Sequence, residues 1–503
     1  MSGRGALAAL LLCLATSAVS ARAAVSSTTL TVCDDVQDPP SLNPYLIFSE
    51  KTLTLLQQML EGLVRFDAQG RVEPALAERW RRVDERRIRF YLRRGVVFHN
   101  GEPFDARSVK FSLEKYVAPE TRYAGYGFVE TIASVAVVDD YTVDVVTNRP
   151  DGLLLNRLAA WAHIVPRRYY QDVGAQGFAE RPVGTGPFQF EEWKKGREVS
   201  FSANPRYWMR GYPKVQRLVF KFLPAEKQLG MLKDGEIDLT TELPGTLTIQ
   251  AAREDDIKVS KKPSFYAVTG SFNSNHGPLK SLLVRRALNY GINKQELIRY
   301  DQLGNGSELA TVTMPGEEGH NDALAPYPYD LRKARALLKE AGYPNGFTLK
   351  VIAKAQGIRA AQILEKQFEK IHVKLELHLI PDAEIIDALR RETWDMIVAG
   401  CPDPMATSYF IQSVFLYSKS PYSLVSDAAY DAHLNEMVAT IDDAKRDLSG
   451  RELDRYIHDQ ALMLFLYQRI KTYGVRKDVV FAPSVTGMSY FFSAEKSSAT
   501  TPR

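Results

Sequence analysis

The chain has 503 residues, of which 45% are hydrophobic and 25% are charged, and its formal net charge is +4. A chain of this length needs two or three hydrophobic cores rather than one. The composition is that of a globular protein, with no low-complexity tract. The nearly balanced charge argues against a nucleic-acid-binding protein, which would favour a concentrated basic surface.

Residues 1–23 have the pattern of a secretory signal peptide. Arg4 supplies the positive start, and residues 6–15 form an apolar stretch that is too short to span a bilayer. Residues 21–23 offer a small-x-small cleavage site, with residues 18–20 as an alternative. No later stretch is apolar enough to cross a membrane, so we expect a soluble, exported protein, periplasmic or extracellular. A retained anchor helix is the alternative.

Two cysteines, Cys33 and Cys401, remain after the expected cleavage. Each follows a predicted strand, and an exported compartment permits a disulfide between them. Two separate buried thiols are the alternative.

The first predicted elements are a short strand over residues 29–32 and a helix over residues 50–61. Leu53, Leu56 and Met59 lie on one side of that helix.

Residues 75–116 predict a strand, a tight turn and a capped helix. Ile88, Phe90 and Leu92 alternate with arginines, as a half-buried strand requires. An Asn-Gly pair at residues 100–101 favours a tight turn, because both residues tolerate positive φ. Asp105 is a good N-cap for the helix that follows.

The same segment resembles the signature of the family 5 extracytoplasmic solute-binding proteins, the peptide-, dipeptide- and nickel-binding components of ABC importers. The residues that fit the signature in order are Leu76, Ala77, Trp80, Phe90, Leu92, Arg93, Gly95, Val96, Phe98, His99, Gly101, Pro103, Ala106, Val109, Phe111, Ser112 and Leu113. Residues 183–208, 273–297 and 327–346 resemble further landmarks of the family. Most of these positions are expected to build the fold rather than to touch a ligand.

The resemblance implies an α/β, two-lobed periplasmic-binding-protein-like fold (type II, cluster C) with an extra subdomain in the first lobe. The implied division is a signal peptide over 1–23, lobe I over 24–70 and 187–268 with its extra subdomain over 71–186, lobe II over 269–476, and a return to lobe I with the C-terminal tail over 477–503. A ligand would lie between the lobes.

Residues 347–400 predict a β-α-β-α-β unit with parallel strands over 347–353, 373–379 and 394–400. Ligands tend to bind beyond the C-terminal ends of such strands. Arg359 begins the helix after the first strand, where its guanidinium suits a carboxylate. Asp403 follows the last strand and could receive an amine. An ordinary ion pair is the alternative for each residue.

One departure from the family concerns the segment after the last of these strands. Peptide-binding members usually carry an aromatic residue and a longer acidic loop there, whereas this chain has only Ala-Gly-Cys-Pro-Asp-Pro-Met, with Cys401 in the place of the aromatic residue. A different small solute therefore stays open beside a peptide.

Aromatic side chains near predicted loop edges are candidates to enclose a ligand. They are Tyr45, Trp161, Tyr409 and Phe410, and packing in the core is the alternative for each.

The sequence contains none of the motifs of a nucleophile elbow, a zinc protease or a P-loop, so we expect a receptor and not an enzyme. The histidines lack metal-ligand spacing, and no cofactor or metal is expected. The predicted partners are a peptide or small-molecule ligand and the membrane permease subunits of an ABC importer, with no nucleic acid, and the protein is expected to be a monomer. A ligand-delivering sensor or chaperone partner and a secreted hydrolase are the alternatives.

Overall fold

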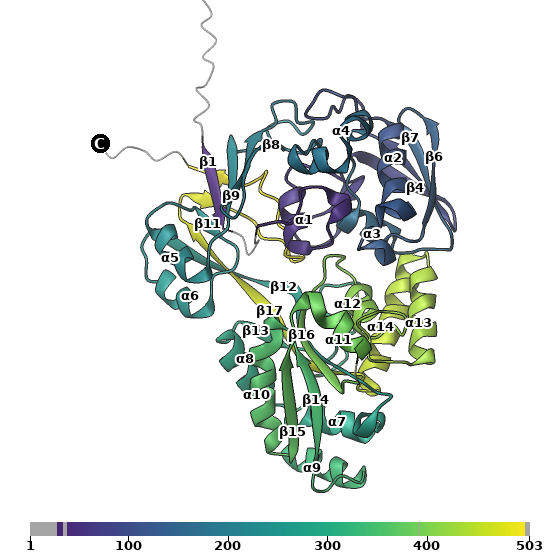
Figure 1. Ribbon diagram of the computed structural model, residues 1–503, viewed down its shortest axis with the longest axis vertical. Coiled ribbons are helices and arrows are strands. Elements are labelled where there is room, and N and C mark those ends of the chain that lie inside the picture. The colour runs from purple at the N-terminus through teal and green to yellow at the C-terminus, as the bar shows by residue number, and fades with distance from the viewer. Residues whose placement is uncertain (1–27, 34–37, 392, 498–503) are drawn as a thin grey trace, which may run out of the picture.

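The computed structural model describes residues 28–33, 38–391 and 393–497, and it has two lobes (Figure 1). The expected signal peptide and its cleavage sites lie outside these residues. No helix among the described residues is long and apolar enough to cross a membrane.

One 11-stranded sheet runs through both lobes. Its strands follow the order β15 (Val373–Leu379), β14 (Phe347–Ala353), β16 (Met396–Pro402), β12 (Ile257–Phe272), β17 (Met463–Arg476), β11 (Leu239–Thr240), β1 (Thr29–Cys33), β10 (Arg217–Lys221), β9 (Glu198–Ala203) and β8 (Phe188–Lys194), with β13 (Gly306–Glu308) also paired to β17.

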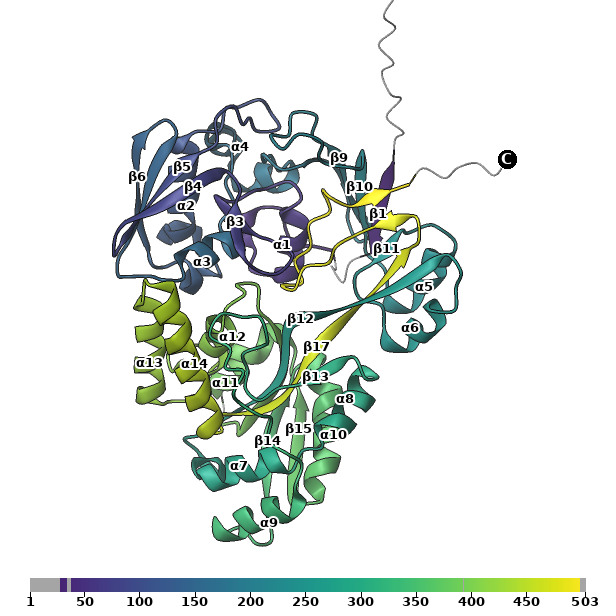
Figure 2. The same cartoon turned by 180° about the vertical axis from the view of Figure 1, so that it is seen from behind.

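The two long antiparallel strands β12 and β17 connect the lobes, as Figure 2 shows from behind. Their register shifts between Pro263 and Ala267, which marks a bulge at residues 264–266. Beyond the bulge β12 pairs with β16 of lobe II, whereas the far end of β17 pairs with β11 of lobe I. We call residues 264–266 the hinge bulge.

Lobe I carries a separate four-stranded antiparallel sheet in the order β4 (Ala77–Asp84), β5 (Arg87–Leu92), β7 (Thr142–Thr147) and β6 (Ile132–Asp139). Helix α2 (Ala106–Val117) packs on the sheet, and the Asp105 carboxylate caps it by accepting the Ser108 N–H at 2.8 Å. Ile88, Phe90 and Leu92 are buried beneath it. The predicted strand, turn and capped helix are confirmed.

The other described helices of lobe I are α1 (Glu50–Leu56), α3 (Leu154–Trp161), α4 (Arg167–Glu180), α5 (Ala225–Lys233) and α6 (Gly245–Ala251), and two short strands, β2 (Val64–Phe66) and β3 (Val72–Pro74), pair with each other. Helix α1 is shorter than the predicted 50–61. It ends in a tightened turn, in which the Gln58 and Met59 N–H groups donate to carbonyl oxygens three residues earlier and the Gln58 side-chain amide takes the Thr54 carbonyl oxygen.

Lobe II contains the predicted β-α-β-α-β unit. Strand β14 pairs in parallel with both β15 and β16, and the crossovers are α10 (Ile358–Glu369) and α11 (Ile385–Arg391). The remaining helices of the described lobe II residues are α7 (Leu282–Tyr290), α8 (Lys294–Gln302), α9 (Leu331–Glu340), α12 (Tyr409–Phe415), α13 (Ala428–Ala439) and α14 (Asp443–Asp459).

The two cysteines are free and buried, one in each lobe. Cys33 packs with Leu229 and Leu232, whereas Cys401 lies opposite Ala267 on the neighbouring strand. The structure therefore has the two separate thiols and not the disulfide. Burial raises the pKa of the Cys401 thiol to about 12, which keeps it protonated and unreactive.

Candidate ligand-binding site

Two adjoining cavities lie between the lobes at the hinge. The first, of about 470 Å³, is lined by the start of α1, the hinge bulge, residues 354–356 after β14, the end of β16 and residues 486–487. The second, of about 690 Å³, extends toward the starts of α5, α6 and α10. Glu242, Gln302, Arg469 and Lys471 line both cavities, so the two form one continuous site.

The parallel strands of lobe II place their carboxyl ends at the first cavity, as the sequence predicted for a sheet of this kind. A glycine is required where this edge turns into α10, because a Cβ at Gly357 would lie 2.7 Å from the Val398 carbonyl oxygen. A Cβ at Gly400 would overlap the Tyr266 hydroxyl. The backbone of β16 and the Tyr266 ring therefore make a close-packed wall.

Charges of both signs line the site. The basic residues among the described lining are Lys51, Lys354, Arg359, Arg469 and Lys471, and the acidic residues are Asp38, Glu50, Glu242 and Asp301. Arg469 forms an ion pair with Glu242 where the two cavities meet. Burial raises the pKa of Tyr266, so its hydroxyl stays a neutral donor and acceptor. Such a lining suits a solute that carries both an amine and a carboxylate.

Arg359 lies where the sequence predicted it, in the first turn of α10 and at the wall of the second cavity. Its side chain is exposed. Within the part of the chain that the structure describes, no ion pair holds its guanidinium. The residue is therefore placed to meet a ligand.

Asp403 lines neither cavity, which corrects the expectation that it receives an amine. Its side chain is only 1% exposed, and its carboxylate accepts the N–H groups of Met405 at 2.7 Å and Thr407 at 3.2 Å. The side chain of Glu317 is its buried neighbour. Asp403 thus closes its own turn, residues 403–407, in which Ala406 has a positive φ of 55°.

The carboxyl groups of Glu317 and Asp403 share a proton. The Glu317 Oε1 atom is buried and finds no donor among the described residues, whereas Oε2 accepts the Met314 N–H. A proton on Glu317 that is donated to Asp403 satisfies both groups. Burial and the Asp403 carboxylate raise the pKa of Glu317 well above its usual range, and burial raises the pKa of Asp403 as well.

The aromatic candidates also lie away from both cavities. Tyr45 is a core residue of lobe I: its hydroxyl donates to the Ser112 carbonyl oxygen at 3.3 Å, and its ring packs on Tyr116 at 4.6 Å. Tyr45 lines neither of the two cavities, contrary to the expectation from the sequence.

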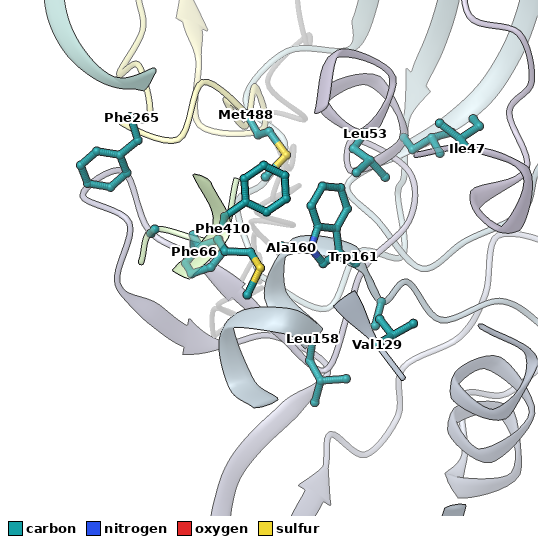
Figure 3. Packing of buried hydrophobic residues seen from close by; sticks show 14 of the residues in the cluster. Ile47, Leu53, Phe66, Val129, Leu158, Ala160, Trp161, Phe265, Phe410 and Met488 are labelled. Carbon is teal, nitrogen blue, oxygen red and sulfur yellow. The ribbon is translucent and has the colours of Figure 1, made fainter. Parts of the chain in front are cut away.

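Trp161, Tyr409 and Phe410 are brought together, but against one another. Phe410 of lobe II lies 5.9 Å from the Trp161 ring of lobe I, and Figure 3 shows both inside one apolar cluster. The Arg157 guanidinium lies 4.7 Å from the centre of the Tyr409 ring. Instead of enclosing a ligand, these residues join the two lobes.

Lys354 of lobe II and the pair Glu50 and Lys51 of lobe I face each other across the first cavity, and the sequence did not predict them as site residues. Lys354 follows β14 immediately and lies at the same strand edge as Arg359, so its position in the sequence predicts a place at the cavity for the same reason. No local pattern marked Glu50 and Lys51, because only the folded chain brings the start of α1 to this edge.

Comparison with known proteins shows close relatives. Residues 71–422 match the family described as bacterial extracellular solute-binding proteins, family 5. The chain is 28% identical to a dipeptide-binding protein of Escherichia coli over 506 aligned positions, which cover 92% of this chain and 93% of the relative. It is 30% identical to a glutathione-binding protein, GsiB, of Salmonella paratyphi A over 347 positions, which cover 67% of each protein.

Among solved structures, the ABC transporter-associated periplasmic binding protein DppA from Helicobacter pylori, in complex with the peptide STSA, superposes with a TM-score of 0.80. It is 25% identical, and the match covers 93% of this chain and 98% of DppA.

The two lobes, the paired crossing strands and the enclosed charged cleft define a two-lobed periplasmic-binding-protein fold (cluster C), as the sequence predicted. The chain belongs to family 5 of the bacterial extracellular solute-binding proteins. It is thus a receptor that binds a solute and not an enzyme, and the family resemblance found in residues 75–116 is confirmed.

Proposed function

We propose that this protein is the solute-binding component of an ABC importer, and that it captures a peptide or a related small solute between its lobes. The observation that carries the proposal is the continuous cavity, lined by both lobes and the hinge and bearing charges of both signs. The names of the dipeptide- and glutathione-binding relatives and the peptide in DppA support a solute of this kind.

In this proposal Lys354 and Arg359 of lobe II receive the carboxylate end of the solute. Both follow β14, and Arg359 adds its bidentate fork to the N-terminal end of α10. Glu50 at the first cavity takes the place given to Asp403 in the sequence analysis and faces the amine end.

Closure follows from the position of the cavity. A solute that touches α1 on one lobe and residues 354–356 on the other makes all its contacts only when the lobes meet, so its binding favours the closed state. The closed protein, acting as a monomer in the periplasm or outside the cell, would then dock on the permease subunits and release the solute intact.

The experiment is a thermal-shift screen of dipeptides, tripeptides, glutathione and nickel–histidine, followed by calorimetric titration of the best binder. A bound solute stabilises the folded form by mass action. Arg359→Ala should weaken the binding of a carboxylate-bearing hit by about tenfold, the effect of roughly 1.4 kcal/mol.

Arg332→Ala is the matched control, because Arg332 is the exposed second residue of α9 as Arg359 is of α10. Equal affinities of the two variants would remove Arg359 from the site, and a screen without any stabilising solute would contradict the proposed function.

A further inference from the structure

The two lobes touch each other directly at a second place beside the hinge. Figures 1 and 2 place α13 and α14 of lobe II next to α3 of lobe I, on the opposite side of the molecule from α5 and α6. The Gly152 N–H donates to the Val438 carbonyl oxygen at 2.8 Å, and the Asn156 side-chain amide donates to the Met405 carbonyl oxygen at 3.0 Å. Both bonds join lobe I to lobe II.

An aromatic contact reinforces these bonds. Phe410 enters a lobe I pocket, with its ring 4.8 Å from Phe128 and 5.9 Å from Trp161, and it is only 6% exposed (Figure 3). The Phe48 ring packs on Trp161 at 4.5 Å. We call the contacts of Gly152, Asn156 and Phe410 the latch.

Lobe I holds its part of the latch rigidly. Asp151 and Arg157 form a fully buried ion pair at 3.0 Å, and the Asp151 carboxylate also accepts the Leu153 N–H and the Thr131 hydroxyl. These bonds fix the loop that presents Gly152. A Cβ at Gly152 would overlap the Thr440 carbonyl oxygen and lie 2.7 Å from the Arg446 guanidinium, so only glycine lets the lobes meet here.

The latch side of the gap between the lobes is filled by side chains. The lobe II turn 403–407 packs against Gly70 of lobe I. The space there is so small that a Cβ added to Gly70 would come within 3.0 to 3.2 Å of Ala406, Phe265 and Val485. Phe265 is at the same time a wall of the first cavity. A solute in the cavities therefore meets packed atoms in this direction when the latch is engaged.

We propose that the latch is a specificity determinant: it adds lobe-to-lobe contacts to closure and restricts the closed cleft to solutes short enough to stay within the two cavities. This inference rests on the proposed function. A longer peptide has to extend between the lobes and hold the latch apart, so the complex lacks the lobe-to-lobe contacts of the latch. The longer peptide therefore binds more weakly than the short peptide that it contains.

Gly152→Ala tests the latch, because its single methyl group meets lobe II atoms. Gly230→Ala is the control, since a Cβ on that α5 glycine meets nothing within 4 Å. The probes are trialanine and an octapeptide that begins with three alanines and continues with serine and glycine, titrated by calorimetry. Phe410→Ala, with Phe347→Ala of lobe II as its control, repeats the comparison with a different contact.

The wild-type protein and both controls should bind trialanine at least tenfold more tightly than the octapeptide. Gly152→Ala and Phe410→Ala should weaken trialanine binding and leave the octapeptide nearly unchanged, so that the preference falls severalfold. Equal preference in all proteins, or equal binding of both peptides by the wild type, would overturn the inference.

If neither peptide binds, that result counts against the proposed function. Small-angle scattering of the same proteins then still tests whether the latch holds the lobes together. With the latch as inferred, Gly152→Ala has a larger radius of gyration than wild type and Gly230→Ala. Identical radii in all three proteins would overturn the latch.

Discussion

The proton shared by Glu317 and Asp403 makes the stability of lobe II depend on pH. Glu317 stays protonated in the folded protein, because burial and the adjacent Asp403 carboxylate raise its pKa well above the usual range. In the unfolded chain the same group ionises near pH 4.3. The folded state therefore binds more protons than the unfolded state above that pH, so this contribution to stability is lost as the pH rises.

The magnitude follows from one proton. Each pH unit in the window above about 4.3 costs the folded state up to about 1.4 kcal/mol through Glu317. Glu317→Gln removes this dependence while it keeps the contacts, because the amide can donate to Asp403 and its oxygen can still accept the Met314 N–H. The stability that the variant gains over the wild type should grow by about 2 to 3 kcal/mol between pH 5 and pH 7.

Urea unfolding at pH 5, 6 and 7, followed by tryptophan fluorescence, measures the difference. Asp454, whose pKa burial raises to about 6, adds to the pH dependence of both proteins and cancels in the comparison. Glu340→Gln at the exposed end of α9 is the control, and it should leave the pH dependence unchanged. Parallel curves for the wild type and Glu317→Gln would refute the shared proton.

Three further outcomes are expected. Asp151→Asn should destabilise the protein by about 3–5 kcal/mol in chemical unfolding, because it leaves the buried Arg157 guanidinium without its counter-charge; an unchanged midpoint would contradict this. Phe90→Ala in the subdomain sheet should cost about 3–5 kcal/mol by creating a cavity, measured in the same assay. A thiol reagent should label Cys33 and Cys401 only after unfolding, and rapid labelling of the native protein would contradict their burial.

The sequence was sufficient where a local pattern determines the structure. Strands β14 and β15 begin and end where the alternation of Val373–Leu379 and the apolar run Phe347–Ala353 predicted, and their parallel pairing places the cavity at the expected edge. The position of Arg359 at the cavity wall was predictable for the same reason: a helix that follows a parallel strand begins at that edge.

The sequence was insufficient where a residue depends on partners far along the chain. Asp403 resembles a ligand-binding acid in its position after β16, but its environment is set by Glu317, which arrives from a separate loop. Trp161 and Phe410 are aromatic residues of the kind that often enclose a ligand. In the folded protein their rings pack against each other, because one lobe closes on the other. No periodicity in either segment carries that information.

The hinge bulge connects the cavity to both lobes. The Phe265 N–H donates to the Val485 carbonyl oxygen of lobe I at 2.7 Å, and the Phe265 carbonyl oxygen accepts the Asp403 N–H of lobe II at 2.6 Å. The same residue lines the first cavity. A solute that contacts Phe265 therefore touches a segment whose backbone is bonded to both lobes. Because the Asp403 turn also presents the Met405 carbonyl oxygen to the Asn156 side chain, the cavity, the hinge and the latch are joined by one connected set of hydrogen bonds. Occupation of the cavity can therefore favour closure without any contact between solute and latch.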